Sequence, residues 1–269
     1  KIIIKGDDKK EKKGDDKKKQ KEDLVVFFQP NRSQKRLLAN LWHRNVILKA
    51  RQLGFTTLIC ILWLDTALFS ENVRCGIIAQ DREAAEVIFR DKVKFAYENL
   101  PEHLKNGMPL ARDSATELLF AHNNSSIRVA TSMRSGTIHR LHISEFGKIC
   151  AKYPDKAVEV VTGSIPAVPQ TGILIIESTA EGREGEFYNI TMRAKAAKDS
   201  NKELTVRDYR FHFFAWWDEE RYCMPADSVK LTDKDNAYFE RIESQIGQPI
   251  SLEKRAWYIA TRDADFSGS

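Results

Sequence analysis

The chain has 269 residues and 42% of them are hydrophobic, which is enough to bury a substantial core in one large domain or two small ones. No segment approaches the roughly 20 consecutive apolar residues that span a bilayer, and the lysine-rich start lacks the apolar stretch of a secretory signal. We therefore expect a soluble globular protein with no membrane partner, and nothing in the sequence points outside the cytosol.

The net charge of +5 is unevenly distributed. Residues 1–23 contain ten lysines and seven acids, so the rest of the chain, with 33 basic and 31 acidic residues, is nearly balanced. We expect 1–23 to be a mobile charged tail, because so little apolar content cannot offset the entropy lost on ordering. The alternative is an arm that binds nucleic acid through phosphate contacts.

From residue 24 onward, strand-like and helix-like segments alternate. The predicted strands are 46–48, 73–79, 141–145, 172–178 and 206–214, and a hairpin is expected over 117–130. The predicted helices are 56–69, 82–99, 154–163, 186–198, 233–246 and 252–262, with N-caps at Asp81, Thr232 and Ser251 and a C-cap at Gly247.

Strands that alternate with helices imply βαβ units, and hence an α/β fold whose mostly parallel central sheet carries helices on both faces. No linker or internal repeat interrupts residues 24–269, which we treat as one domain. Ligands of such sheets bind at the carboxyl ends of the strands, so polar residues that follow strands are the candidates for a site.

The first candidate is the loop LKARQLGFTTL, residues 48–58. Phosphate loops normally read GxxxxGK[ST], and here Gly54 and Thr56 fit while Phe55 stands in the place of the lysine. Lys49 falls at the first position of the pattern, from which it could reach phosphates across the loop. Backbone NH groups at the start of the next helix also suit an anion. An ordinary strand-turn-helix connection would explain the same segment.

Two further segments follow predicted strands. ATPases of the strand-loop-helix type end one central strand with two acids. In RLHISEFG, residues 140–147, the pair Ser144-Glu145 stands at that place. Glu145 must therefore act as the base, while Ser144 could only hold a metal-bound water. In ESTAEG, residues 177–182, small hydroxyl residues could sense a terminal phosphate. Each signal is weak alone, and a surface glutamate would explain the first. Their order at successive strand ends favours a nucleotide site.

Together with QPNRSQKRLL, residues 29–38, these three segments resemble the large terminase subunits of tailed bacteriophages, which are DNA-packaging motors. The resemblance covers residues 28–188 well and the rest loosely. Some members, the lambda-like ones, carry the lysine at the front of the phosphate loop, and Lys49 matches that place. The family implies a RecA-like P-loop NTPase fold and hydrolysis of ATP with Mg²⁺ to move double-stranded DNA into a procapsid.

The resemblance also implies roles for single residues. Gln34 resembles the glutamine that reads adenine, and Glu145 resembles the catalytic carboxylate. Thr56, together with Ser144 and Glu145, is expected to form the Mg²⁺ site. The expected nucleotide contacts are Lys49, Ala50, Arg51, Gln52, Leu53, Gly54, Phe55, Thr56 and Thr57 of the loop and Ser178, Thr179 and Ala180 of the coupling motif.

Three arginines are candidates for charge stabilisation during hydrolysis. Arg51 matches an arginine that senses or stabilises the γ-phosphate, although a solvated loop arginine would look the same. Arg134 is the first candidate for a finger given to a neighbouring subunit, and Arg140 is the second. Surface salt bridges are the alternative for both.

The family further implies a homo-oligomeric ring, the portal protein and the small terminase subunit as partners, and the host cytoplasm as the location. Full-length members carry an RNase H-type nuclease domain, which we do not place in this chain; Asp263 and Asp265 fit helix-end acids better than nuclease ligands.

Phe55 and Ser144 each remove a charge from the standard site. The alternatives are therefore a helicase-like translocase of the same superfamily and a nucleotide-binding assembly module that does not hydrolyse ATP.

Two expectations concern residues outside the site. The aromatic cluster 212–217, HFFAWW, has strand-like spacing and is expected to pack in a core rather than to stack on bases. The four isolated cysteines, which lack any CxxC spacing, are expected to be reduced packing residues rather than disulfide or zinc ligands: Cys60, Cys75, Cys150 and Cys223.

Overall fold

A computed structural model describes residues 2–4, 24–134 and 136–265. The chain divides into a first unit, Lys1–Phe213, and a second unit, Phe214–Ser269, so residues 24–269 do not form the single domain expected from the sequence. Most of the predicted tail lies outside the described residues. Its first part forms a short strand, β1 (Ile2–Ile4), which pairs antiparallel with β2 (Leu24–Val26).

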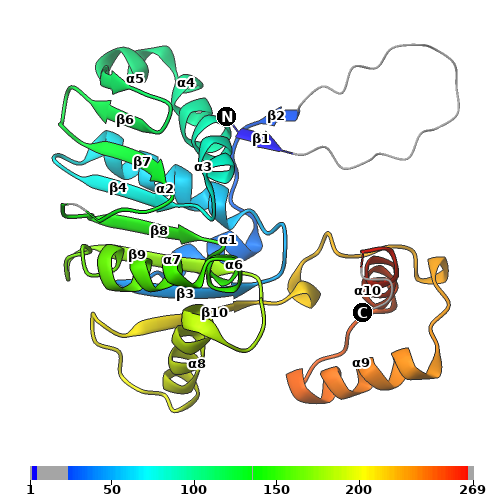
Figure 1. Ribbon diagram of the computed structural model, residues 1–269. Coiled ribbons are helices and arrows are strands. Elements are labelled where there is room, and N and C mark those ends of the chain that lie inside the picture. Colours follow the sequence, from blue (N-terminus) through cyan, green and yellow to red (C-terminus); the bar gives the residue numbers. More distant parts are fainter. Residues whose placement is uncertain (1, 5–23, 135, 266–269) are drawn as a thin grey trace, which may run out of the picture. The chain divides into compact units, whose positions relative to one another are not determined.

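An eight-stranded sheet forms the centre of the first unit, in the order β10-β3-β9-β8-β4-β7-β6-β5 (Figure 1). Neighbours from β3 to β7 are parallel, while β6 and β5 are antiparallel additions at one edge, which confirms a mostly parallel sheet and the predicted hairpin. The strands are β3 (Arg44–Lys49), β4 (Arg74–Ile78), β5 (Leu110–Asp113), β6 (Glu117–Phe120), β7 (Ser126–Ala130), β8 (Arg140–Ser144), β9 (Ile173–Ser178) and β10 (Tyr209–Phe214).

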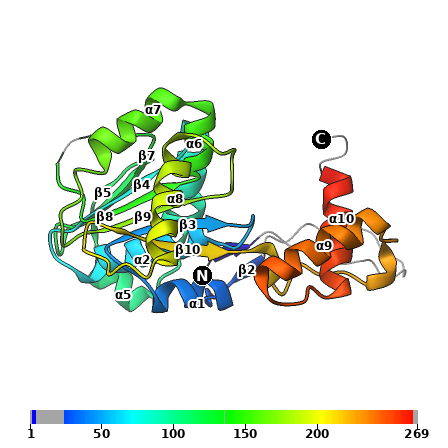
Figure 2. The same cartoon turned by 90° about the horizontal axis from the view of Figure 1, so that it is seen from below.

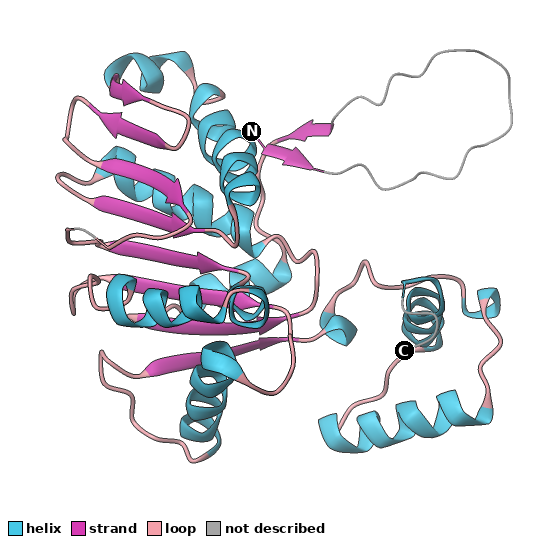
Figure 3. Ribbon diagram, viewed as in Figure 1, coloured by secondary structure: helices cyan, strands magenta, loops and turns pink. Residues whose placement is uncertain are grey.

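Helices cover both faces of this sheet, as predicted (Figures 2 and 3). A π-helical segment, Phe89–Lys94, interrupts the helix expected over 82–99, and another, Val160–Ser164, follows α7. The helices of the first unit are α1 (Arg32–Ala39), α2 (Phe55–Phe69), α3 (Arg82–Ile88), α4 (Phe95–Glu98), α5 (Glu102–Gly107), α6 (Phe146–Lys152), α7 (Pro154–Glu159) and α8 (Gly185–Asp199). No helix among the described residues is long and apolar enough to cross a membrane.

The pleat of the central strands directs their side chains alternately to two faces, and both faces are apolar along most of their length. Alternate residues of β3, β8 and β9, among them Val46, Ile143 and Ile176, belong to the core under α6 and α8. Because successive side chains of a strand point to opposite faces, the intervening residues, including Lys49 and Glu177, lie on the other face. That face packs against α2, so the polar ends of the three strands meet at the start of this helix.

The second unit has a small core of its own. Its helices α9 (Asp233–Ile246) and α10 (Leu252–Asp265) bury Phe239, Ile250 and Ile259, with Trp216 and Trp217 packed against them. Core packing is therefore confirmed for the two tryptophans. Earlier in the same aromatic cluster, Phe214 is also buried, whereas Phe213 is 41% exposed.

The predicted helix caps are confirmed. Asp81 accepts a hydrogen bond from the backbone NH of Ala84, and Thr232 forms a capping box with Asp235. Ser251 Oγ accepts from the backbone NH of Lys254 at 3.4 Å. Gly247 ends α9 in the left-handed conformation, with φ of 70°.

Acids and cysteines outside the site take ordinary roles. Asp263 pairs with Arg262 at 2.8 Å near the end of α10, as a helix-end acid would, and the side chain of Asp265 lies outside the described set. All four cysteines are free. Burial raises the pKa of Cys60 and Cys75 to about 12, which agrees with inert packing residues, whereas Cys223 is exposed.

His212 of β10 makes the fold sensitive to acid. Its Nε2 donates to Asn45 Oδ1 at 3.0 Å, and the side chain is buried. Burial, reinforced by the charges of Arg210, Lys198 and Arg36, lowers its pKa from 6.5 to about 4. The imidazole is therefore neutral in the folded chain at neutral pH.

We expect the free energy of unfolding to fall by roughly 2–3 kcal/mol between pH 6.5 and 4, because in this window the unfolded chain binds a proton at His212 that the folded chain does not. Urea unfolding at a series of pH values measures the slope. His212→Gln should flatten it, and the exposed His103→Gln should leave it unchanged. An unaltered slope in His212→Gln would contradict this assignment.

Candidate functional site

Lys49, the last residue of β3, lies between two carboxylates. Its Nζ is 3.0 Å from Glu145 Oε1 and 3.1 Å from Glu177 Oε2. The lysine side chain is 6% exposed, and this burial by itself would lower its pKa. The charges of Glu177 and Glu145 outweigh the burial and raise the pKa instead, so Lys49 is a buried cation.

Glu177, near the end of β9, is the centre of the polar cluster. Its Oε1 accepts hydrogen bonds from Ser144 Oγ at 2.8 Å and Thr56 Oγ1 at 3.1 Å, and His142 Nε2 lies 3.3 Å away. The carboxylate is fully buried, which opposes ionisation, but Lys49 and these donors hold the pKa of Glu177 well below its usual range. Glu177 is therefore an ionised carboxylate without access to bulk water.

Strand register explains why these side chains meet. Glu177 is the ladder partner of Ser144 on β8 and of Ile47 on β3, so β9 lies between the two strands that carry the predicted site residues. Glu177 begins the coupling segment ESTAEG, but no role for it was predicted from the sequence. The signal was present, because a carboxylate at the end of the otherwise apolar strand GILIIES must have a charged partner once it is buried.

The loop after β3 has the sharp turn that a phosphate loop needs. Gln52 and Gly54 have φ of 56° and 73°, and α2 begins directly afterwards. Gln34 Nε2 donates to the carbonyl oxygen of Gly54 at 2.8 Å, and Asn31 Nδ2 donates to that of Leu53 at 3.2 Å. In this structure Gln34, predicted to read adenine, braces the loop and caps α1 through its Oε1.

Phe55 occupies the position at which phosphate loops normally carry a lysine, and its side chain lies in the core. The Phe55 side chain is 1% exposed and belongs to the core of the first unit. A cation in its place would be buried in apolar surroundings. Another cation, Lys92 from the π-helical segment, approaches the start of α2 and donates from Nζ to Thr57 Oγ1 at 3.0 Å. Sequence reasoning missed Lys92, because only the tertiary fold brings it there.

Glu145 occupies a strained connection between β8 and α6. Its φ and ψ of 52° and 45° are left-handed, an unusual conformation for a residue with a side chain. This turn places the Glu145 side chain, which is 23% exposed, beside the buried Lys49, with Lys148 Nζ 3.5 Å from the buried oxygen Oε2.

The predicted coupling motif touches the start of α6. A Cβ on Gly147 would lie 2.8 Å from Ser178 Oγ and 3.1 Å from the carbonyl oxygen of Thr179, so glycine permits this close approach. Ser178 Oγ is buried and has no hydrogen-bond partner among the described residues. Ala180, the last residue of the motif, is exposed. Gly147, two residues after Glu145, therefore lies in close contact with the coupling segment.

The structure does not bring the two candidate finger arginines to Lys49 of the same chain. Arg134 is 64% exposed and pairs with Glu159 at 2.5 Å. It lines a pocket of about 560 Å³ beside Arg74 and His139, near the amino ends of β4 and β8. Arg140 begins β8, whereas Ser144 ends it.

The remaining loop residues expected to contact nucleotide follow Lys49 directly. Arg51 is exposed there, whereas Leu53 is buried and Ala50 is half-buried.

The donors present suit Mg²⁺ better than a metal with a complete protein shell. Among the residues that the structure describes, no group of three or more His, Cys, Asp and Glu side chains is arranged to hold a metal ion. Mg²⁺ commonly keeps several waters and uses one or two carboxylates together with phosphate oxygens. The hydroxyls of Thr56 and Ser144 with the carboxylates of Glu145 and Glu177 match that pattern.

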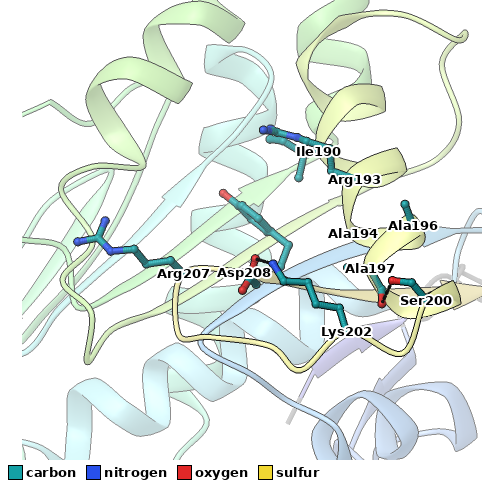
Figure 4. Close-up of a pocket in the computed structure, with 10 residues that line it drawn as sticks. Ile190, Arg193, Ala194, Ala196, Ala197, Ser200, Lys202, Arg207 and Asp208 are labelled. Atoms are coloured by element: carbon teal, nitrogen blue, oxygen red, sulfur yellow. Dashed lines mark hydrogen bonds and ion pairs between the residues drawn. The ribbon is translucent and has the colours of Figure 1, made fainter.

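Another pocket lies apart from this cluster. It has a volume of about 600 Å³ and is lined by α8 and the residues that precede and begin β10, including Arg193, Lys202 and Arg207 (Figure 4). One of these cations is already paired, since Lys202 Nζ donates to Asp208 Oδ1 at 2.8 Å. The pocket contains none of the predicted site residues.

Comparison with known proteins supports the fold. No family model and no curated protein sequence matches the chain. The crystal structure of the HK97 bacteriophage large terminase aligns with a TM-score of 0.56 and 17% identity, over 89% of this chain and 48% of that one. The Thermus phage P74-26 large terminase ATPase domain aligns with a TM-score of 0.51 and 16% identity, over 84% and 94%. The chain thus has the RecA-like fold of these ATPase domains and spans about half of the HK97 protein.

Removing the Lys49 charge should destabilise the chain. Lys49→Met leaves Glu177 buried without its cation, and we expect a loss of about 3–5 kcal/mol in the free energy of unfolding. The matched control is Lys148→Met, which removes the more exposed partner of Glu145 and should cost less than about 1 kcal/mol.

Urea unfolding at pH 7 measures both losses, and adding Glu177→Gln to Lys49→Met should recover much of the stability. Equal losses for the two lysine variants would show that the buried pair does not hold the site together.

Proposed function

We propose that the first unit is the ATP-hydrolysing motor domain of a bacteriophage DNA-packaging terminase. The observation that carries this proposal is the convergence of Lys49 and Glu145, at the ends of β3 and β8, with Thr56 at the start of α2. These are the groups that phosphoryl transfer needs: a cation, a hydroxyl for the metal and a carboxylate for water. The fold shared with terminase ATPase domains agrees with this function.

Each residue then has a defined task. The Lys49 ammonium exchanges a carboxylate partner for phosphate oxygens and neutralises their charge. Glu145, whose side chain is 23% exposed, accepts a proton from, or orients, the attacking water. Thr56, Ser144 and Glu145 would hold Mg²⁺, which when bound would neutralise negative charge on the phosphates. The loop residues 50–57 supply backbone NH groups to the phosphates.

The contact between Gly147 and the coupling segment gives hydrolysis a route to the rest of the domain. Residues 178–180 relay the presence or loss of the terminal phosphate. Gln34 recognises the adenine, and Arg51 senses or stabilises the γ-phosphate. Arg134, exposed and away from its own site, serves a neighbouring subunit in a homo-oligomeric ring. The ring grips double-stranded DNA through its backbone without base readout. It assembles with the portal protein and small subunit in the host cytoplasm.

Two rivals make different predictions. A nucleotide-binding assembly module, motivated by Phe55 and Ser144, would show no phosphate release that depends on Lys49, so the wild type and Lys49→Ala would be alike. A helicase-like translocase would unwind a duplex, which a packaging motor does not do.

Glu145→Gln should lower ATP turnover by roughly 10²–10⁴-fold, because the amide cannot accept a proton from water. Affinity for ATP should remain largely intact, since the amide keeps the size of the side chain. Phosphate release and equilibrium nucleotide binding measure the two effects, and the exposed Glu184→Gln is the matched control. Normal turnover in Glu145→Gln would refute the catalytic assignment.

Arg134→Ala and Lys49→Ala should each be nearly inactive alone, since an arginine finger is worth roughly 10³–10⁵ in rate. A mixture of the two variants should regain activity, because each Lys49→Ala subunit offers Arg134 to an intact site on its neighbour. Phosphate release at several mixing ratios and protein concentrations measures the effect. No recovery would count against Arg134, and the same mixture with Arg140→Ala tests the second candidate.

A further inference from the structure

The metal site lacks one of the charges that such sites normally have. A P-loop ATPase holds Mg²⁺ with the hydroxyl of the phosphate loop and with the acid that ends a neighbouring strand. Ser144 stands at that strand end and brings a hydroxyl but no charge. The chain must obtain the missing carboxylate elsewhere if it binds the metal in this way.

Glu177 lies where a substitute carboxylate is needed. It is the ladder partner of Ser144 on the adjacent strand, on the same face of the sheet, and Ser144 Oγ donates to it at 2.8 Å. The same carboxylate oxygen accepts from Thr56 Oγ1 at 3.1 Å. An acid at position 144 would place its carboxylate next to the phosphate-loop hydroxyl. In this chain Glu177 does so instead.

We propose that Glu177, on β9, takes over the metal-positioning role that Ser144 has lost on β8. This inference rests on the proposed function and names a residue to which neither the sequence motifs nor the family resemblance assigned a role.

Hydrogen-bond chemistry explains how Glu177 would act. A hydroxyl carries one proton and two acceptor lone pairs. Because Thr56 and Ser144 both donate their protons to Glu177, their oxygen lone pairs remain available for a cation or its waters. Glu177 is thus a positioning residue that orients two hydroxyls and adds a negative charge behind them.

The two carboxylate oxygens of Glu177 have different partners. Oε2 faces Lys49 Nζ at 3.1 Å, whereas Oε1 faces the two hydroxyls and His142 Nε2. A carboxylate buried only as the counter-charge of Lys49 would also need hydrogen-bond donors for its other oxygen. Two of the donors found here are the hydroxyls of Thr56, in the phosphate loop, and of Ser144, at the strand end, which is what metal positioning requires. Mn²⁺ binding distinguishes that role from charge balance alone.

The test measures Mn²⁺, as a paramagnetic probe for Mg²⁺, binding to the full chain together with a non-hydrolysable ATP analogue. Glu177→Gln should weaken Mn²⁺ binding by roughly 10–100-fold, as loss of an outer-shell partner does. Binding of the analogue without metal should not weaken. Glu177→Asp keeps the charge but withdraws it from Thr56, so Mn²⁺ binding should weaken there as well. The exposed Glu184→Gln should behave as wild type.

A compensating variant guards against simple unfolding. Ser144→Asp combined with Glu177→Gln returns the carboxylate to β8 with the wild-type net charge, and it should regain most of the Mn²⁺ affinity. Circular dichroism of every variant reports folding. Wild-type Mn²⁺ affinity in Glu177→Gln or Glu177→Asp would overturn the inference, as would an equal loss of analogue affinity with and without metal.

The two levels of proposal fail differently. A wild-type chain that binds no analogue with Mn²⁺ would remove the proposed function and this inference with it. A wild type that binds both, with a Glu177→Gln variant that binds them equally well, would remove this inference alone.

Discussion

The site depends on one buried ammonium shared between two carboxylates. Neither Lys49 nor Glu177 could stay charged at this depth without the other, because an isolated buried charge costs several kcal/mol. The cluster ties together the carboxyl ends of β3, β8 and β9 and, through Thr56, the start of α2. Its polar geometry is thus as much a consequence of strand register as of side-chain choice.

The same interaction gives the proposed motor a way to sense its nucleotide. Phosphate oxygens would compete with Glu145 and Glu177 for Lys49, so binding would free the Glu145 carboxylate at the moment when water must be activated. The left-handed backbone of Glu145 leads directly into α6, whose first turn touches Ser178 through Gly147. The exchange of Lys49 from a carboxylate to a phosphate would then be transmitted to Ser178 at the end of β9, without a large movement of the core.

The sequence predicted the sheet and most helices well because their apolar periodicity is strong, and α9 was predicted at its observed bounds. It did not predict α1 or α6, which are short and stabilised by tertiary contacts and, in α1, by the Asn31–Gln34 capping box. Loop spacing and the family resemblance both predicted a role for Lys49, which the structure places between Glu145 and Glu177. For Glu177 the apolar strand indicated only that a charged partner was needed, and for Lys92 no local pattern indicated a role. Strand pairing and the packing of a distant helix bring these two residues to the site.

A crystal structure of the chain with Mg²⁺ and a non-hydrolysable ATP analogue tests the role of Lys49 most directly. We predict that Lys49 Nζ leaves Glu145 and lies about 3 Å from a β- or γ-phosphate oxygen. An ammonium that stays between Glu145 and Glu177, with the triphosphate bound by other cations, would contradict it.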